Sequence, residues 1–334
     1  MDALKGKKYV LAGDIGGTKT NLGLFKIEGS LPVQSVVRKF ASRNESGLEK
    51  IIERFLQIYD VHVESACFGI AGPVIRGRCR TTNLPWDVSE KKIIKRFGWD
   101  HAKLVNDLEA MAFGIPRLSG TEVYSLNKKR IKRDESFSLI APGTGLGMVL
   151  SLRHDGKYIM IPSEGGHAGF SPDSKEECYL WESLHKRYGH VSLERVLSGP
   201  GLLNIFMWLR DKRRYKEPKW LSERMKRVDP AMAITQAAME NRTPICVKTL
   251  ETFVSALGSA AGNLALTGMT LGGVYLGGGI PAKILPLLKS GRFMRSFVDK
   301  GRFTDILREI GVRVVLDEKA SLSGAAHIAF NMTK

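Results

Sequence analysis

The first residues that could do chemistry form one short segment between an apolar run and a stretch of alternating apolar and polar residues: Gly13, Asp14, Ile15, Gly16, Gly17, Thr18 and Lys19. Glycines lack a Cβ atom, so successive backbone N–H groups can approach an anion closely. A carboxylate at the end of a strand, here Asp14, can hold a hydrated divalent cation. We therefore expect a site for phosphate and magnesium at this turn.

Two better-known phosphate motifs do not fit this segment. The P-loop pattern requires a glycine where Thr18 stands and a helix after it, whereas residues 21–25 have the pattern of a strand. The glycine fingerprint of dinucleotide-binding folds, which opens a helix, is absent from this segment. A tight glycine hairpin that binds no ligand stays a second interpretation at this point.

Two later glycine-rich turns have a related setting. Gly143-Thr144-Gly145 joins two apolar strands and repeats the pattern of the first segment, which suggests an internally duplicated architecture. Gly277-Gly278-Gly279 follows another apolar strand and precedes Pro281, a residue that suits the first turn of a helix. Because these glycines carry no side chains, a flat ligand can lie against the backbone there.

Asn106 and Asp107 stand where a strand ends and a helix begins, the position at which α/β folds place ligands. The Asp107 carboxylate could face such a ligand. It could equally be an N-cap, whose side chain satisfies the free N–H groups of the first helical turn. Both interpretations stay open on these residues alone.

Glu164 and His167 flank two glycines, so both side chains can converge on one small ligand. One carboxylate and one imidazole are a weak signal for zinc, whereas a carboxylate can accept hydrogen bonds from two adjacent hydroxyls of a polyol. Glu194 offers another carboxylate beside a glycine-rich turn. Its alternative is an acidic residue in a first helical turn, with Ser192 as the N-cap.

The elements that must position these residues follow from the apolar periodicity. We expect three successive strands at 9–14, 21–26 and 33–40, then a helix at 47–59. Further strands are expected at 66–70 and 103–107, and further helices at 108–114 and 250–269. Pro116 closes one of these helices and marks a domain boundary. A length of 334 residues exceeds that of most single domains, so two α/β domains are expected.

The composition narrows the class of protein. The net charge of +17 raises the possibility of nucleic-acid binding, but acidic residues interrupt the basic segment 210–227 and no helix-turn-helix or RNA-binding signature accompanies it. A solvated basic surface is the better interpretation. No apolar window is long enough to span a membrane, no signal-peptide core precedes the first strand, and four scattered cysteines indicate reduced thiols in the cytoplasm.

Together these motifs resemble those of bacterial glucokinases, in the hexokinase and actin-like ATPase superfamily, from Asp14 to about His327. Asp14–Thr20 and Gly143–Gly145 resemble the family's two phosphate motifs, and Gly277–Gly279 its adenosine motif. Thr82-Asn83-Leu84-Pro85-Trp86 resembles the sugar-side segment, and the run 189–201 is especially characteristic. A related group of repressors and kinases carries a cysteine-rich zinc motif soon after the histidine. Residues 168–177 contain no cysteine, so the resemblance points to the zinc-free branch.

The resemblance implies a two-domain actin-like ATPase (ribonuclease H-like) α/β fold with an interdomain cleft. A small α/β domain would comprise residues 1–115 and about 316–334, and a large α/β domain residues 116–315. The family further implies a cytoplasmic homodimer that closes on its sugar, with neither a membrane nor a nucleic acid as partner.

The implied activity is ATP- and Mg²⁺-dependent phosphorylation of glucose at its C6 hydroxyl, which yields glucose 6-phosphate for glycolysis. Asp107 would be the catalytic base and Asp14 the metal ligand. The expected sugar ligands are Asn83, Asn106, Asp107, Glu164, His167 and Glu194. The expected ATP ligands are Gly13, Asp14, Ile15, Gly16, Gly17, Thr18, Lys19, Gly143, Thr144, Gly145, Gly277, Gly278 and Gly279.

Two other functions stay as alternatives to glucose phosphorylation. One is a kinase for another hexose, such as mannose, fructose or an N-acetylated amino sugar. The other is a regulator that senses sugar without turnover. The presence of Asp14, Asp107 and the phosphate glycines together argues against the regulator, because a sensor has little need for a catalytic base.

Overall fold

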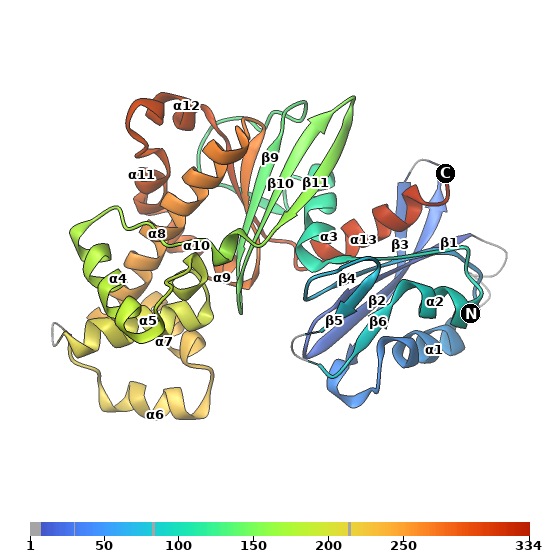
Figure 1. The fold of residues 1–334 in the computed structure, drawn as a ribbon, viewed down its shortest axis with the longest axis horizontal. Helices are drawn as coiled ribbons and strands as arrows, with labels where there is room; N and C mark the ends of the chain where they lie inside the picture. The colour runs from blue at the N-terminus through green and yellow to red at the C-terminus, as the bar shows by residue number, and fades with distance from the viewer. Residues whose placement is uncertain (1–7, 30, 82–83, 213–214) are drawn as a thin grey trace. The chain divides into compact units, whose positions relative to one another are not determined.

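The computed structural model describes residues 8–29, 31–81, 84–212 and 215–334. The chain divides into two compact units (Figure 1). The first unit comprises Met1–Leu118 and Asp317–Lys334, and the second comprises Ser119–Leu316. The last helix of the chain therefore belongs to the unit that contains the first strand.

The first unit is built on a mixed five-stranded sheet with the strand order β3-β2-β1-β4-β7. Its strands are β1 (Tyr9–Ile15), β2 (Lys19–Glu28), β3 (Leu31–Ala41), β4 (Val63–Ile70) and β7 (His101–Asn106). β1 pairs with β4 and β4 with β7 in parallel, so their carboxyl ends meet at one edge of the sheet. That register sets Asp14 opposite Gly69, and Ile70 opposite Asn106.

Helices cover both faces of this sheet because β1, β2 and β4 are apolar on both sides. On one face, α1 (Leu48–Tyr59) packs its buried residues Ile51, Ile52 and Phe55 against the sheet, as the predicted apolar stripe requires, and α2 (Glu90–Phe97) adds Ile93. On the other face lie α3 (Asp107–Gly114) and α13 (Ala320–Asn331). A short hairpin, β5 (Arg78–Arg80) and β6 (Asp87–Ser89), completes the unit together with the turns η2 (Ser42–Asn44) and η3 (Ile115–Arg117).

Glycines let α3 and α13 cross in close contact. A Cβ atom on Gly324 would lie 1.7 Å from the carbonyl oxygen of Ala110, and one on Gly114 would lie 2.6 Å from that of Ala320. Both distances are far below van der Waals contact, so no larger residue fits without moving a helix. The close crossing is what brings the C-terminal helix to the start of α3.

The second unit contains a six-stranded sheet with the order β11-β10-β9-β12-β13-β8. Its strands are β8 (Val123–Ser125), β9 (Phe137–Pro142), β10 (Leu146–His154), β11 (Lys157–Ser163), β12 (Gly273–Leu276) and β13 (Val312–Val315). As in the first unit, an antiparallel hairpin, here β9 and β10, is extended by parallel strands on one side.

The centre of the second unit's helical layer is α8 (Pro244–Gly268), which extends the predicted helix 250–269 toward its amino end. Cβ atoms on Gly258 and Gly262 would lie 2.3 and 2.5 Å from the carbonyl oxygens of Phe293 and Phe297, so these glycines allow α11 to pack closely. The remaining helices and turns are η4 (Gly165–His167), α4 (Lys175–Tyr188), η5 (Leu193–Arg195), α5 (Gly199–Asp211), α6 (Lys219–Arg227), α7 (Pro230–Met239), α9 (Gly279–Lys283), α10 (Leu285–Leu288), α11 (Arg292–Val298), η6 (Gly301–Phe303) and α12 (Thr304–Glu309).

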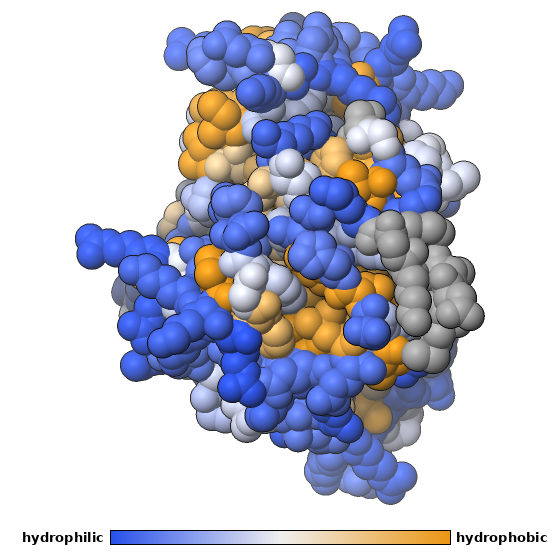
Figure 2. Space-filling model, turned by 90° about the vertical axis from the view of Figure 1, so that its right-hand side faces the viewer, coloured by the Kyte–Doolittle hydropathy of each residue, from blue (hydrophilic) through white to orange (hydrophobic). Residues whose placement is uncertain are grey.

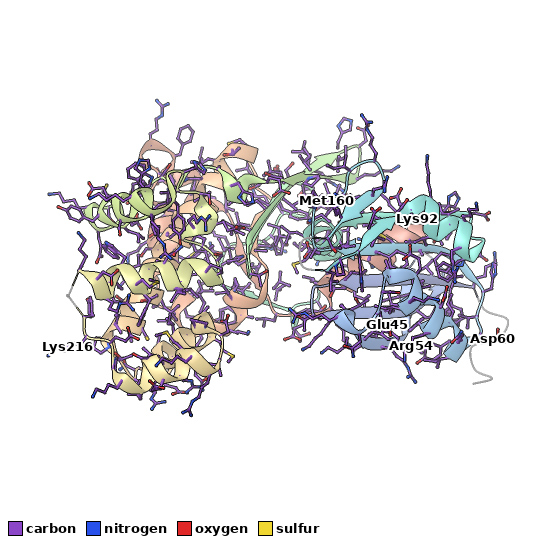
Figure 3. All side chains as sticks on the ribbon, turned by 60° about the horizontal axis from the view of Figure 1, so that its bottom comes forward. Glu45, Arg54, Asp60, Lys92, Met160 and Lys216 are labelled. Carbon is purple, nitrogen blue, oxygen red and sulfur yellow. The ribbon has the colours of Figure 1, made fainter. Side chains whose placement is uncertain are left out.

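The basic segment 210–227 lies at the end of α5, in the following loop that carries Lys216, and on α6 (Figure 3). Its two aromatic side chains, Tyr215 and Trp220, pack against the apolar core of the second unit. The guanidinium of Arg242 covers the Trp220 ring at 4.2 Å from its centroid. These rings therefore do not project as a platform for nucleic-acid bases.

The surface is polar, as the charge content leads one to expect. On the face shown in Figure 2, hydrophilic side chains surround smaller hydrophobic areas. Among the helices that the structure describes, none is both long enough and apolar enough to cross a membrane.

Candidate active site

The first glycine turn joins β1 to β2 as a tight hairpin rather than leading into a helix. The Gly16 N–H donates to the Lys19 carbonyl oxygen at 2.9 Å and closes the turn. Gly13 has a packing role, since a Cβ atom there would lie 2.5 Å from the Phe68 ring. The packing of the core beneath the turn thus requires a glycine at residue 13, whatever ligand the turn binds.

Ser42, a residue that no sequence motif indicates, hydrogen bonds to the backbone of this turn. Its N–H donates to the Thr18 carbonyl oxygen at 3.1 Å, and its hydroxyl donates to the Gly16 carbonyl oxygen at 2.8 Å. The Ser42 and Thr20 hydroxyls are 2.9 Å apart, and both residues are fully buried. The start of η2 therefore fixes the carbonyl groups of Gly16 and Thr18, and the N–H groups of Gly17 and Thr18 stay available to an anion.

Asp107 is the first residue of α3, and the N-cap position belongs to Asn106. The Asn106 side-chain oxygen accepts a hydrogen bond from the Leu108 N–H at 2.9 Å, which is the usual N-cap interaction. The interpretation of Asp107 as the N-cap is therefore wrong by one residue, although its own carboxylate also accepts from the Leu108 N–H at 2.9 Å. The Asn106 amide group donates in turn to the Gly72 carbonyl oxygen at 3.2 Å.

Asp14 and Asp107 are half-buried, and both have raised pKa values. Burial is the main cause of the raised pKa of Asp107, and the negative charge of Asp14 adds to it. Burial likewise raises the pKa of Asp14, against the opposing effect of hydrogen bonds from Asn21 and Ser321. The Asn21 amide lies 3.3 Å from the Asp14 carboxylate. Two interacting carboxylates with raised pKa values are typical of a functional site.

Trp86, the last residue of the predicted sugar-side segment, forms a long-range hydrogen bond. The indole N–H of Trp86 donates to the Glu45 carbonyl oxygen at 3.1 Å, three residues after the Ser42 that supports the glycine turn. Asn83, which the sequence analysis selected as a sugar ligand, lies outside the described residues.

The other two glycine motifs lie side by side in the second unit. Gly143 to Gly145 form the turn between β9 and β10, in which the Gly143 N–H donates to the Gly145 carbonyl oxygen at 2.8 Å. Gly278 has a φ of +80°, and a Cβ atom there would lie 2.6 Å from the carbonyl oxygen of Pro142. The triple-glycine turn thus packs directly on the end of β9, where the second phosphate motif begins.

Glu164 and His167 lie at the short turn η4, next to the same hairpin. A Cβ atom on Gly166 would lie 2.0 Å from the Leu146 carbonyl oxygen, so only glycine lets η4 pack on β10. The Glu164 and His167 side chains are 76% and 61% exposed, with 4.0 Å between the carboxylate and the imidazole nitrogen. Two exposed polar groups at this spacing are available to a ligand with several hydroxyls.

Glu194 lies on the turn η5, which is hydrogen bonded to the segment after η4 through the Leu193 N–H and the Ala168 carbonyl oxygen at 2.9 Å. Ser192 is the N-cap residue of η5 and Glu194 is the acidic residue of its first turn, as the alternative expected, but the Ser192 side chain makes no capping hydrogen bond and η5 is a single 3₁₀ turn. The Glu194 carboxylate accepts a hydrogen bond from the Leu146 N–H at 2.9 Å. The second unit therefore brings together Glu164, His167, Glu194 and the second phosphate motif.

The residues present suit a magnesium ion better than a metal ion held by several protein side chains. Among the described residues, no group of three or more histidines, cysteines or acidic residues could hold a metal ion. Asp14 supplies one half-buried carboxylate that interacts with a second, Asp107, and a cation there would compensate the negative charge. Mg²⁺ is typically held in this way, by one or two carboxylates with water and substrate phosphates as the other ligands.

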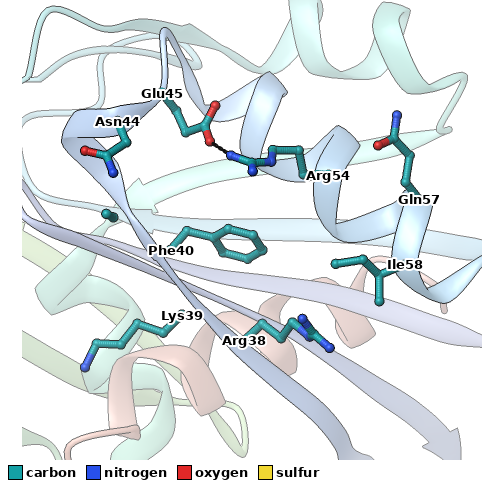
Figure 4. A pocket seen from close by; sticks show the side chains of 9 residues that line it. Arg38, Lys39, Phe40, Asn44, Glu45, Arg54, Gln57 and Ile58 are labelled. Atoms are coloured by element: carbon teal, nitrogen blue, oxygen red, sulfur yellow. Dashed lines mark hydrogen bonds and ion pairs between the residues drawn. The ribbon is translucent and has the colours of Figure 1, made fainter.

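A cavity of about 470 Å³ lies elsewhere in the first unit, between β3 and α1 (Figure 4). Its arginines already have partners. Arg54 forms an ion pair with Glu45, which Figures 3 and 4 show side by side, and Arg38 donates to the Tyr59 hydroxyl at 2.6 Å. Because these interactions satisfy the guanidinium groups, we assign no ligand to this cavity.

Comparison with known proteins decides which family has this arrangement. Residues 11–332 match the family model described as Glucokinase. This chain belongs to the glucokinase family. The glucokinase of Nostoc punctiforme is 36% identical over 95% of this chain and 97% of its own length. The predicted family and the enzyme class, a sugar kinase, are therefore confirmed.

Solved structures of glucokinases share the fold. A glucokinase from an Antarctic psychrotroph is 28% identical, with a TM-score of 0.86 over 97% of this chain and 99% of the other. A ROK family glucokinase from Streptomyces griseus, solved with glucose and AMPPNP, has a TM-score of 0.65 at 21% identity, over 97% of this chain and 99% of the other. The predicted α/β actin-like ATPase fold is confirmed by these matches.

Proposed function

We propose that this protein transfers the γ-phosphoryl group of ATP to the C6 hydroxyl of glucose, with Asp107 as the catalytic base. One observation carries the assignment of roles. Asp107 is a half-buried carboxylate with a raised pKa, at the same sheet edge as Asp14 and the first glycine turn. A base in that position can accept a hydroxyl proton next to a bound phosphate.

In the proposed reaction the C6 oxygen attacks the γ-phosphorus. The new O–P bond forms as the bond to the β-phosphate oxygen breaks, ADP leaves, and Asp107 accepts the hydroxyl proton. Phosphoryl transfer depends mostly on positioning and charge neutralisation. The N–H groups of Gly17 and Thr18 in the first turn, and of Thr144 and Gly145 in the second, are the donors that this chain offers to the phosphates. The glycines at 277–279 offer a flat surface to the adenosine.

Asp14 is the residue that would hold Mg²⁺. Its carboxylate is half-buried and its negative charge raises the pKa of Asp107, so a cation at Asp14 would lower the pKa of Asp107 and keep that carboxylate ionised. When bound there, Mg²⁺ would neutralise negative charge on the phosphate oxygens. The chain's own contribution is to fix Asp14 through Asn21 and the β1–β2 register.

Sugar selectivity would come from hydrogen bonds to individual hydroxyls. Asn106, Glu164, His167 and Glu194 are the proposed ligands, together with Asn83. A sugar epimer that misplaces one hydroxyl leaves one of these groups without its partner, and such losses discriminate strongly in a desolvated site.

The free thiols Cys67, Cys79 and Cys246 are buried, which suits a protein of the reducing cytoplasm. The family resemblance leads us to expect a homodimer there.

The assignment of the base is tested by the variant Asp107→Asn. We expect kcat to fall by about 10²- to 10⁴-fold, while glucose still binds, since the amide keeps the shape of the side chain but accepts no proton. Asp100→Asn is the matched control, because Asp100 is exposed at the opposite end of β7 and should leave kcat unchanged. Robust turnover by the Asp107→Asn protein would overturn the assignment.

A further inference from the structure

The Glu194 carboxylate is bonded to the second phosphate hairpin and at the same time lies among the proposed sugar ligands. Its Oε2 atom accepts the Leu146 N–H at 2.9 Å, and Leu146 directly follows the turn at residues 143–145. Among the described residues, no hydrogen-bond partner is present for the other oxygen, Oε1. One carboxylate thus has one oxygen engaged with the hairpin and one free for a ligand.

The hairpin is shaped to receive this carboxylate. A Cβ atom on Gly145 would lie 2.6 Å from Glu194 Oε2. Any side chain at residue 145 would therefore displace the carboxylate from the Leu146 N–H. Gly145 is required by the position of Glu194 as much as by a phosphate, whereas Gly143 has open space at its Cβ position.

Glu194 is itself held rigidly by the start of α5. The Ser198 hydroxyl donates to the Glu194 carbonyl oxygen at 2.7 Å and accepts from the Gly201 N–H at 3.0 Å, and Ser198 is fully buried. The Gly199 N–H donates to the Gly143 carbonyl oxygen at 2.8 Å. The same helix end therefore anchors both the turn η5 and the far side of the hairpin, and the Glu194 carboxylate joins the two.

We propose that Glu194 is a positioning residue for the nucleotide, because its carboxylate fixes the second phosphate hairpin in the conformation that receives ATP. This role comes in addition to its proposed contact with the sugar, and it rests on the proposed function. A hydrogen bond that anchors Leu146 restricts the turn before it, so loss of the bond leaves the turn to be ordered when the nucleotide binds. Sugar and nucleotide then act on one carboxylate, and each affects the affinity for the other.

The test measures nucleotide binding in the absence of sugar, with Mg·ADP as the probe and calorimetry as the readout. We expect Glu194→Ala to weaken Mg·ADP binding by about 10-fold, the size expected for loss of a charge-assisted hydrogen bond. Glu194→Gln should restore most of the affinity, since its side-chain oxygen can accept the Leu146 N–H. Glu164→Ala is the matched control, because Glu164 has no hydrogen bond to the hairpin. This variant should bind glucose more weakly and bind Mg·ADP with the affinity of the wild type.

A double-mutant cycle with Gly145→Ala checks the contact directly. In the wild-type background the new methyl group displaces the Glu194 carboxylate, whereas in the Glu194→Ala background that carboxylate is absent. The loss of Mg·ADP affinity caused by Gly145→Ala should therefore be smaller in the second background. Equal losses in both backgrounds would overturn the inference.

The outcomes separate this inference from the proposed function. If the wild type binds both glucose and Mg·ADP, and Glu194→Ala binds Mg·ADP as the wild type does, the positioning role is wrong and the proposed function stands. If the folded wild type binds neither glucose nor Mg·ADP, both are wrong. Thermal melting of each variant shows whether it is folded, and the rescue by glutamine distinguishes positioning from a general loss of structure.

Discussion

The Ser321 hydroxyl donates a hydrogen bond to the Asp107 carbonyl oxygen at 3.1 Å, although 214 residues separate the two in the chain. Ser321 is also one of the groups that lower the pKa of Asp14. Gly69 makes room for this contact, since a Cβ atom there would lie 3.2 Å from the Ser321 hydroxyl and 3.5 Å from the Asp107 Cα atom. The C-terminal helix thus contributes directly to the position of the proposed base.

Ser321→Ala should therefore reduce kcat while the protein stays folded. Without the hydroxyl, the first turn of α3 loses an anchor and Asp14 loses a hydrogen bond, so we expect a fall in kcat of roughly 3- to 30-fold and a loss of stability of about 1 kcal/mol. Ser323→Ala is the control, two residues along the same helix and only half-buried. Unchanged kcat in Ser321→Ala would show that the C-terminal helix does not position Asp107.

Two adjacent glycines of the adenosine motif should respond differently to alanine. Gly278 has a φ of +80° and its Cβ position is 2.6 Å from the Pro142 carbonyl oxygen, whereas at Gly279 a Cβ atom meets nothing within 4 Å. Gly278→Ala should lower the free energy of unfolding by roughly 1–3 kcal/mol. Gly279→Ala should leave it nearly unchanged and weaken nucleotide binding alone, because its methyl group occupies the surface proposed for the adenosine.

Chemical denaturation and Mg·ADP titration of the two glycine variants provide the measurement. If Gly278→Ala and Gly279→Ala lose the same stability, the close contact of Gly278 with the Pro142 carbonyl oxygen does not restrict residue 278. Full nucleotide affinity in Gly279→Ala would contradict the proposed location of the adenosine.

His327 should make the stability of the protein depend on pH. Burial, and the positive charge of Arg117, lower the pKa of His327 to about 4 in the folded state, compared with about 6.5 for an unfolded chain. Between these two values the unfolded chain binds a proton that the folded protein does not. Folding therefore becomes less favourable as the pH falls through this window, and full stability is present only above about pH 6.5.

Urea denaturation at several pH values between 7 and 4 tests the role of His327. The loss of stability toward acid pH should be smaller in His327→Gln than in the wild type. His62→Gln is the control, because the His62 side chain is 79% exposed. If the wild type and His327→Gln lose stability in parallel, His327 does not titrate as described.

Local patterns were enough to predict the elements that carry the proposed site. The strand expected at 9–14 is observed as Tyr9–Ile15, and the helix expected at 47–59 as Leu48–Tyr59. Such elements depend on neighbouring residues, whose periodicity is visible in the sequence. The ambiguity at Asn106 and Asp107 was also local, because adjacent Asn and Asp residues are equally good N-caps and only the geometry shows which one starts the helix.

The supporting contacts could not be predicted, because they join distant parts of the chain. Ser42 gave no signal, since a serine after a strand is an ordinary loop residue until its hydroxyl is seen against the Gly16 carbonyl oxygen. The Glu194 contact spans 48 residues, and nothing in the sequence pairs it with Leu146. At Gly13 the sequence suggested a role that the structure does not require. The glycine fits a phosphate motif, yet the Phe68 ring fills the space that a side chain at residue 13 would occupy.

The most direct test of the proposed function is ADP release by the purified protein with Mg·ATP and, in turn, glucose, mannose, fructose and N-acetylglucosamine. We predict the highest kcat/KM with glucose, with glucose 6-phosphate as the product identified by phosphorus NMR. A higher kcat/KM with another sugar would make the protein a kinase for that hexose. ADP release that no sugar raises above the sugar-free rate would contradict the proposed phosphorylation altogether.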